Sequence, residues 1–227
     1  MAFYSIAIDG PSGAGKSSMA RTIAEKYGFI YVDTGAIYRT VGLAAHRRGI
    51  SCSDEPAIAK LLPELKIEMK YDGSGEQRMN LDGEDVSSDI RLPEISICAS
   101  DVSALPAVRE FLLEMQRSMA RTNNVIMDGR DIGTVVLPDA DVKIFLTASS
   151  AARARRRLLQ LMEKGINADF DKVLEEIEYR DNQDSSREVA PLRAADDAVL
   201  VDTSDIGIEE TVTLLSSIIE EKLKIGS

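Results

Sequence analysis

A glycine-rich segment near the N-terminus constrains the fold of this chain more than any other feature. The segment Gly10-Pro11-Ser12-Gly13-Ala14-Gly15-Lys16-Ser17 matches the pattern Gly-x-x-x-x-Gly-Lys-Ser/Thr. An apolar run from Phe3 to Ile8, expected to be a buried strand, precedes it, and helical spacing from Lys16 to Tyr27 follows it. Glycines let the backbone wrap around an anion, and the N-terminus of the helix adds partial positive charge. The segment therefore predicts a loop that binds nucleotide phosphates.

Two side chains of this loop have expected roles. Lys16 should reach the β and γ phosphates of ATP, and Ser17 should offer its hydroxyl to Mg²⁺. The residues expected to contact the nucleotide are Gly10, Pro11, Ser12, Gly13, Ala14, Gly15, Lys16, Ser17 and Ser18. A glycine-rich turn with an incidental lysine is the alternative, but the flanking strand and helix favour the phosphate loop.

Strands and helices alternate around the loop. Further strands are expected at 29–32, 125–127, 142–146 and 198–201, and further helices at 36–48, 150–164, 169–188 and 208–223. This alternation predicts an α/β fold with a five-stranded parallel sheet flanked by helices.

The middle of the chain breaks this alternation. After a short helix near 55–62, Ile67 to Tyr71 and Arg78 to Leu81 alternate in polarity, and glycine-containing turns follow both runs. Helices return from Arg91 to about Arg121, with an interruption near Leu105-Pro106. We expect one domain (1–227) with a core at 1–50, 122–150 and 190–227, an inserted small antiparallel sheet subdomain at 51–121, and a helical lid at 151–189.

Composition limits the partners. The chain is 44% hydrophobic and 29% charged, with a formal net charge of −11, so we expect no binding to a nucleic acid polymer or an anionic membrane. No apolar run approaches the roughly 20 residues of a membrane span. The first residues, from Met1 to Ser5, lack the basic flank of a signal peptide. We expect a cytoplasmic monomer.

Arginines gather on two consecutive predicted helices. Arg153, Arg156 and Arg157 have the spacing i, i+3, i+4, and Arg180, Asp184 and Arg187 have the spacing i, i+4, i+7. This spacing predicts that each set shares one helical face. Solvated helices with a salt bridge are the alternative. In an acidic chain, however, this concentration favours a lid that closes over ATP, with Arg153 and Arg157 contacting the transferred phosphoryl group.

Polar residues also follow two of the predicted strands, in the segments Asp33-Thr34-Gly35 and Asp128-Gly129-Arg130-Asp131. Ligands of open parallel sheets bind at the carboxyl ends of the strands, so both segments should lie near the loop. Asp128 could hold a water bound to Mg²⁺, and Arg130 and Asp131 could recognise the acceptor. For Asp33 and Asp128, the alternative role is that of a helix cap or turn former.

Longer stretches around these segments resemble a known family. The stretches Ile8 to Ser17, Asp33 to Arg39, Asp128 to Thr134 and Arg180 to Leu192 are similar to bacterial-type cytidylate kinases, in order and over nearly the whole chain. The resemblance implies a P-loop nucleoside monophosphate kinase fold. It also implies an ATP- and Mg²⁺-dependent transfer of phosphate to CMP or dCMP, a step of pyrimidine metabolism.

The resemblance also implies an acceptor site formed by Thr34, Tyr38, Arg39, Ser100, Arg109, Arg130, Asp131, Arg180, Asp184 and Arg187. In the family pattern Ser100, Arg109 and Asp131 face cytosine. Arg39, Arg130 and Arg180 face phosphate, and Asp184 and Arg187 lie by the sugar. Two departures are visible: Thr34 stands where serine is common, and Ser17-Ser18 stands where glycine-threonine is common.

Transfer to a monophosphate needs no general base, because the attacking oxygen is already ionised near neutral pH. Two alternatives remain open. One is a P-loop kinase for a hydroxylated metabolite, in which Asp33 could act as the base. The other is a nucleotide-dependent switch without transfer activity. A regulatory GTPase is not indicated, because the guanine-reading Asn/Thr-Lys-x-Asp segment is missing.

Overall fold

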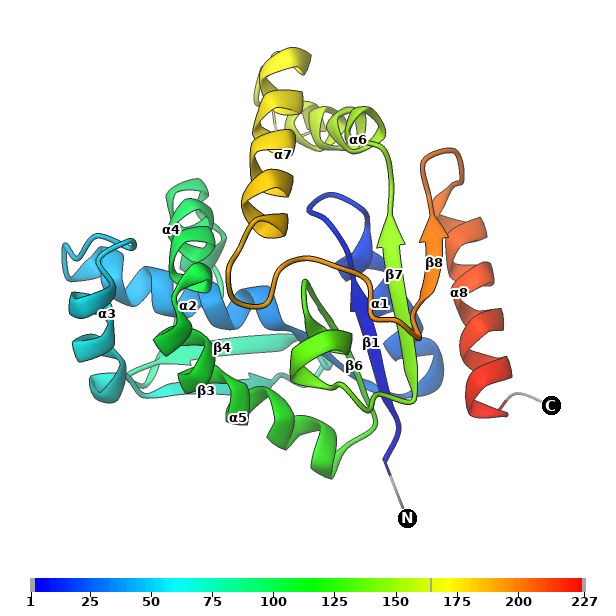
Figure 1. Ribbon diagram of the computed structural model, residues 1–227, viewed down its shortest axis with the longest axis horizontal. Helices are drawn as coiled ribbons and strands as arrows, with labels where there is room; N and C mark the ends of the chain where they lie inside the picture. The colour runs from blue at the N-terminus through cyan, green and yellow to red at the C-terminus, as the bar shows by residue number, and fades with distance from the viewer. Residues whose placement is uncertain (1–2, 164, 226–227) are drawn as a thin grey trace. The chain divides into compact units, whose positions relative to one another are not determined.

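The computed structural model describes residues 3–163 and 165–225 (Figure 1). Met1 and Ala2 of the expected N-terminal stretch, and Lys164 of the helix expected from Ser150, lie outside the described residues. The chain divides into two compact units, one formed by Met1–Tyr31 and Asn123–Ser227 and the other by Val32–Thr122. The boundaries predicted for core, insert and lid stay a prediction.

A five-stranded sheet has the order β2-β6-β1-β7-β8. Its strands are β1 (Ser5–Asp9), β2 (Ile30–Asp33), β6 (Val125–Gly129), β7 (Val142–Thr147) and β8 (Val199–Asp202). β1 pairs in parallel with both β6 and β7, and β7 pairs in parallel with β8. The predicted five-stranded parallel sheet is confirmed.

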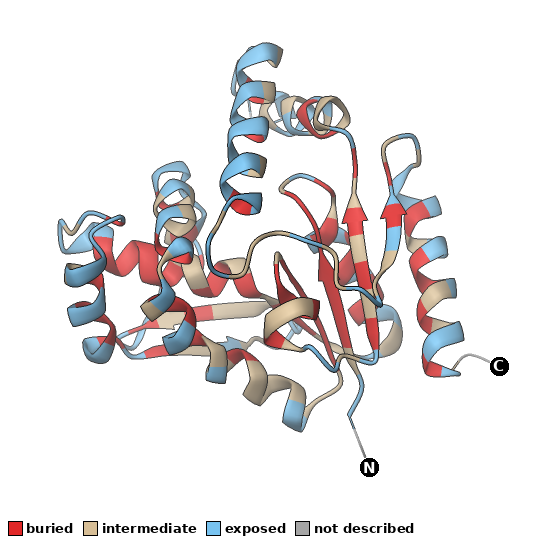
Figure 2. Ribbon diagram, viewed as in Figure 1, coloured by how far each residue is buried: buried red, intermediate tan, exposed pale blue. Residues whose placement is uncertain are grey.

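Two helices complete the main core of the first unit: α1 (Lys16–Tyr27) and α8 (Ile208–Leu223). Met19, Ile23 and Ala24 of α1 are buried, as their helical spacing predicts. They pack in one cluster with Ile6 and Ile8 of β1, with residues of β6, β7 and β8, and with apolar side chains of α8. Figure 2 shows β1 and β6 as almost wholly buried, whereas β8 is partly exposed. Burying each large apolar side chain contributes about 1.5–3 kcal/mol.

The expected lid forms a helical pair, α6 (Ser150–Glu163) and α7 (Phe170–Ser185). Ala154, Val173 and Ile177 form its small buried core, and most of the outer surface of α7 is exposed (Figure 2). The helix predicted at 169–188 is too long at both ends. Asp169 caps α7 from outside by accepting from the N–H groups of residues 171 and 172, and the last helical residue is Ser185.

The second unit contains α2 (Thr34–Arg47), α3 (Glu55–Leu61), α4 (Pro93–Ala104) and α5 (Pro106–Thr122). Its antiparallel sheet has the order β3-β4-β5, with bounds Ile67–Tyr71, Gln77–Leu81 and Glu84–Asp85. The predicted small antiparallel sheet and the break near Leu105-Pro106 are confirmed, and proline begins α5. Short 3₁₀ turns at Leu62–Glu64 and Asp89–Arg91 complete the unit.

Within the described part of the chain, no helix combines the length and apolarity needed to cross a membrane.

Candidate active site

The glycine-rich segment forms the loop between β1 and α1. Gly10 and Gly15 have φ values of 148° and 93°, which disfavour any residue with a side chain. A Cβ atom on Gly10 would lie 1.9 Å from the carbonyl oxygen of Leu146, so the loop passes directly against β7. α1 begins after Gly15 with no side-chain cap, which leaves its first N–H groups suited to an anion.

Lys16 lies within this loop. Its ammonium group donates a hydrogen bond to the carbonyl oxygen of Pro11 at 2.8 Å, and the residue is only 5% exposed. Burial, together with the charge of Arg130, lowers the pKa of Lys16 to about 7, although Asp128, Asp9 and Asp184 act in the opposite direction. The phosphates of a nucleotide would supply the negative charge that this lysine requires.

Ser17 and Asp128, predicted to share a metal ion, lie together. The Ser17 hydroxyl donates to Asp128 Oδ2 at 2.8 Å, and the Tyr31 hydroxyl donates to Oδ1 at 2.9 Å. The proton of Ser17 therefore points at the carboxylate, which leaves the lone pairs of its oxygen available to a cation. The role of Tyr31 was not predicted, because the sequence shows only that this residue lies in an apolar strand.

These residues fit a magnesium ion held mainly by nucleotide oxygens. Among residues 3–163 and 165–225, no group of three or more His, Cys, Asp or Glu side chains is placed to bind a metal. Mg²⁺ commonly takes one or two protein ligands, with water and phosphate filling the other positions. One hydroxyl backed by one carboxylate matches that mode.

A buried carboxylate at the end of β1 binds the segment that follows β6. Asp9, the last residue of β1, accepts hydrogen bonds from the backbone N–H groups of Ile132 at 2.8 Å and Gly133 at 2.7 Å. These amides begin a π-helical turn, Ile132–Val136, directly after Arg130 and Asp131. Burial and then the charge of Asp131 raise the pKa of Asp9 to about 6, against the effect of the two N–H donors and Lys16. Neither the turn nor this role of Asp9 is visible in the sequence pattern.

Asp184 is the centre of an ion-pair cluster that includes Arg130, two residues after Asp128 in the sequence. Asp184, 5% exposed, accepts from Arg130 Nε at 2.6 Å and also from Arg187. Burial alone would raise the pKa of Asp184, but the charges of Arg130 and Arg187 hold it below its usual range, and exposed Arg180 adds to this. The prediction that Arg187 shares a helical face with Arg180 is wrong, because α7 ends at Ser185. Arg187 reaches Asp184 from the segment after the helix.

The arginines of α6 differ in their surroundings. Arg153 is buried and donates to the carbonyl oxygens of Ala148 (2.8 Å) and Ser12 (3.0 Å) and to the Asp181 carboxylate (2.9 Å). Arg156 donates to the hydroxyl and carbonyl oxygens of Thr203. Arg157 is exposed and has no hydrogen bond or ion pair within the described residues. Of the three, Arg157 is the one whose guanidinium is available to a ligand.

The second unit carries the other half of the predicted acceptor residues. Thr34 is buried at the start of α2, and the Arg109 guanidinium lies 5.6 Å from the centre of the Tyr38 ring. Arg109 also donates to the carbonyl oxygen of Ser103 at 3.1 Å, and Ser103 in turn donates to the carbonyl oxygen of Ser100 at 2.8 Å. Tyr38, Ser100 and Arg109 therefore belong to one contact chain.

Asp33 is a helix cap. Its carboxylate accepts from the backbone N–H of Ala36 at 2.9 Å and from Arg39 at 2.8 Å. The Arg39 Nε atom is buried and has no hydrogen-bond partner among the described residues. The capping interpretation of Asp33 is confirmed.

The predicted acceptor residues divide between the two compact units. The second unit contains Thr34, Tyr38, Arg39, Ser100 and Arg109, and the first contains Arg130, Asp131, Arg180, Asp184 and Arg187.

Comparison with known proteins identifies the family. The family model described as cytidylate kinase matches residues 6–221. The cytidylate kinase of Lactobacillus johnsonii is 51% identical over 219 residues, which cover 96% of this chain and 95% of the relative. That of Caldicellulosiruptor bescii is 50% identical over 91% of both chains, and that of Geobacter sulfurreducens is 49% identical over 96% of this chain and 93% of the relative.

A solved structure supports the fold alone. An uncharacterized protein from Eubacterium ventriosum matches 96% of this chain and 98% of its own chain, with a TM-score of 0.52 at 13% identity. Together with the family match over residues 6–221, the phosphate loop and the parallel sheet assign this chain to the cytidylate kinase family, whose members are ATP-dependent phosphotransferases.

Proposed function

We propose that this chain transfers the γ-phosphoryl group of ATP to CMP or dCMP, giving ADP and CDP or dCDP, as a step of pyrimidine nucleotide metabolism. One observation carries the proposal: a phosphate loop with a buried Lys16 lies in a chain that matches the cytidylate kinase family over residues 6–221. Relatives about 50% identical over most of their length share the name cytidylate kinase.

On the donor side, the loop from Gly10 to Ser18 would hold the phosphates of ATP with backbone N–H groups, and Lys16 would contact the β and γ oxygens. Mg²⁺, when bound, would neutralise charge on these oxygens, with Ser17 as a direct ligand and Asp128 acting through a water. The contact of Ser17 with Asp128 at 2.8 Å supports this pairing of roles.

On the acceptor side, the arginine side chains and one unpaired buried donor support binding of a monophosphate. Arg39, Arg130 and Arg180 would bind the acceptor phosphate, and the buried Arg39 Nε is a donor suited to an oxygen of that group. Ser100, Arg109 and Asp131 would recognise cytosine, with Thr34 and Tyr38 beside them. Asp184 and Arg187 would bind the sugar, and the carboxylate of Asp184 would balance the charge of Arg130.

The state of Asp33 argues against the rival hydroxyl kinase. A catalytic base must be free to accept a proton from the acceptor hydroxyl. Both carboxylate oxygens of Asp33 already accept hydrogen bonds, one from the first turn of α2 and one from Arg39. A phosphate acceptor needs no such base, so the arrangement favours transfer between phosphates.

The lid residues would complete the site. We place Arg157, exposed on α6, against the transferred phosphoryl group, with Arg153 holding the phosphate loop from behind and contacting the same group on closure. Exclusion of water by this closure would prevent hydrolysis of ATP.

The experiment is ADP production from ATP and Mg²⁺ with CMP, dCMP, UMP, AMP and GMP offered separately. We expect strong turnover with both cytidine nucleotides, weaker turnover with UMP and negligible turnover with the purine nucleotides. Turnover with none of the five would overturn the acceptor assignment and direct the search to hydroxylated metabolites.

A further inference from the structure

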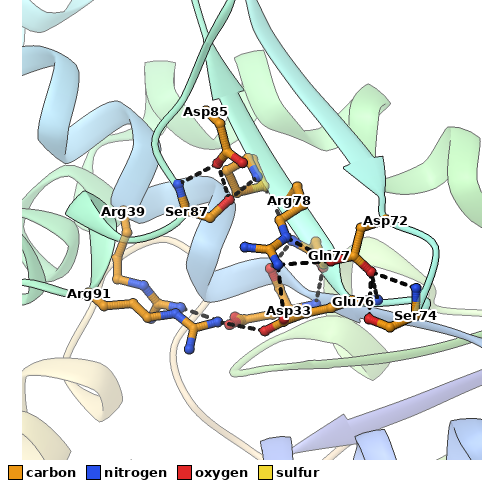
Figure 3. A network of polar contacts seen from close by, with 11 residues as sticks. Asp33, Arg39, Asp72, Ser74, Glu76, Gln77, Arg78, Asp85, Ser87 and Arg91 are labelled. Atoms are coloured by element: carbon orange, nitrogen blue, oxygen red, sulfur yellow. Dashed lines mark hydrogen bonds and ion pairs between the residues drawn. The ribbon is translucent and has the colours of Figure 1, made fainter.

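We propose that Gln77, a residue of the small antiparallel sheet, is a positioning residue for the acceptor site. Its side chain forms hydrogen bonds with the backbone of Asp33 (Figure 3) and so sets the start of α2, the helix that carries Thr34 and Arg39. The inference rests on the proposed function, because Thr34 and Arg39 are acceptor residues within it. Gln77 itself would act without touching the nucleotide.

The contact between the two residues is double. Gln77 Oε1 accepts from the backbone N–H of Asp33 at 2.8 Å, and Gln77 Nε2 donates to the carbonyl oxygen of Asp33 at 3.1 Å. A carboxamide has the same donor and acceptor as a peptide group, so this side chain pairs with Asp33 as a neighbouring strand would. Rotating the amide by half a turn would set its NH₂ group against the Asp33 N–H. The pairing therefore fixes one orientation.

Asp33 passes this constraint to the acceptor residues. One carboxylate oxygen caps α2 through the N–H of Ala36 at 2.9 Å. The other accepts a hydrogen bond from the Arg39 guanidinium at 2.8 Å (Figure 3). Because both backbone polar groups of Asp33 are hydrogen-bonded to Gln77, the carboxylate extends from a fixed backbone position. Arg39 is thereby held with its buried Nε unpaired among the described residues. A shift of about 1 Å in such a group is enough to weaken binding or rate strongly.

Gln77 is itself firmly held. It is the first residue of β4 and pairs with Tyr71 of β3. Its neighbours are also paired: Arg78 pairs with Asp72 of the same hairpin at 2.9 Å, and Glu76 pairs with Arg91 of the 3₁₀ turn Asp89–Arg91 at 3.2 Å (Figure 3). The second hydrogen of Nε2 contacts the sulfur of Met79 at 3.3 Å, so the amide has no donor left unused. The antiparallel sheet thus acts as a fixed support for the start of α2.

The experiment compares Gln77→Met with Arg91→Met. Methionine keeps the length of the side chain but cannot form either hydrogen bond, and Arg91→Met removes an ion pair of the same hairpin without touching Asp33. We expect Gln77→Met to raise KM for CMP and dCMP roughly tenfold, because two backbone groups lose their partners. KM for ATP should change by less than about twofold, and Arg91→Met should leave all constants near wild type.

Gln77→Glu provides a second variant. Glutamate can still accept from the Asp33 N–H, but its carboxylate repels the Asp33 carbonyl oxygen and competes for Arg39. We therefore expect a larger rise in KM for CMP than with methionine. An unchanged KM for CMP in both variants would overturn the proposal, as would an equal rise in KM for CMP and ATP.

Amide hydrogen exchange separates this proposal from the proposed function. In Gln77→Met the amides at the start of α2, Ala36 among them, should exchange faster than in Arg91→Met, with no nucleotide present. Unchanged exchange would overturn the positioning role. If the wild type turned over neither CMP nor dCMP, the proposed function would fail, while this measurement would still decide whether Gln77 holds Asp33.

Discussion

Arg153 donates a hydrogen bond to the backbone carbonyl oxygen of Ser12 at 3.0 Å, which ties helix α6 to the phosphate loop. The same guanidinium binds the Asp181 carboxylate of α7, so one buried side chain connects three segments of the first unit. Arg157, four residues further along α6, is exposed and has no such contact within the described residues. Arg153 therefore has a supporting role in addition to its proposed contact with the phosphoryl group, whereas Arg157 has only the proposed contact.

This difference predicts opposite outcomes for two alanine substitutions. Arg153→Ala should lower the free energy of unfolding by about 2–4 kcal/mol, because the Asp181 carboxylate and two carbonyl oxygens lose their hydrogen-bond donor. Arg157→Ala should leave the melting temperature unchanged but lower kcat on the order of 100-fold, as expected for loss of one charge that stabilises the transition state. Calorimetry, and kcat at saturating ATP and CMP, would measure both effects.

Arg155→Ala is the matched control, since Arg155 is also exposed on α6 without a partner among the described residues. It should change neither quantity. Wild-type kcat in Arg157→Ala would remove Arg157 from the mechanism.

Binding of ATP should take up protons at Lys16. In the free protein, burial and the charge of Arg130 lower the pKa of Lys16 to about 7, so at about pH 8 most of these side chains are neutral. Bound phosphates favour the charged form, so the pKa rises and the protein absorbs a large fraction of one proton. Titration calorimetry in buffers of different ionisation enthalpy would measure this uptake. Lys16→Met should bind ATP without it and lose on the order of 1,000-fold in kcat.

The contact between Ser17 and Asp128 predicts how the enzyme responds to Mg²⁺. Ser17→Ala should raise the Mg²⁺ concentration for half-maximal activity roughly tenfold, since it removes the direct ligand. Tyr31→Phe removes only the second hydrogen bond to Asp128, so its effect should be smaller. The affinity for ATP, measured with and without Mg²⁺, gives a readout independent of turnover. An affinity that gains equally from Mg²⁺ in wild type and Ser17→Ala would contradict the assignment.

Local patterns predicted much of the fold. The bounds of α1 and α8 follow from apolar spacing, and the strand Ile67–Tyr71 follows from alternation. The phosphate loop was visible because its glycines, Lys16 and Ser17 are adjacent in sequence. Arg187 was misplaced because the i, i+7 spacing continues past the point where α7 ends, and no strong stop signal marks Ser185. β5 was not predicted, because it has only two residues and these show no alternation of apolar and polar side chains.

Contacts between distant residues were not predictable in the same way. Asp9 meets Ile132 and Gly133 across more than 120 residues, and Gln77 meets Asp33 across 44. Each contact depends on how strands are ordered and how an irregular turn points its N–H groups, and neither is encoded in local periodicity. An aspartate at a strand end or a glutamine in a hairpin can bind many different partners, so the residue type alone does not predict which partner it binds.

The buried carboxylate of Asp9 predicts a pH dependence of stability. Burial, followed by the charge of Asp131, raises its pKa from 3.8 to about 6 in the folded protein, against the lowering effect of the two N–H donors and Lys16. Between these values the folded chain holds a proton that the unfolded chain has released. The contribution of Asp9 to the free energy of unfolding therefore falls as pH rises from about 4 to about 6 and is constant above about 7.

Asp9→Asn removes this titration while keeping the size of the side chain. The amide offers one acceptor to two backbone donors, so the turn after Arg130 and Asp131 should loosen, and kcat/KM for CMP should fall roughly tenfold at pH 8. Urea unfolding of both proteins at several pH values gives the decisive quantity, the wild-type free energy of unfolding minus that of the variant. This difference should decrease by about 2–3 kcal/mol across the window. A difference that is flat or rises with pH would show that Asp9 is ionised throughout, and that the two N–H groups of the π-helical turn outweigh its burial.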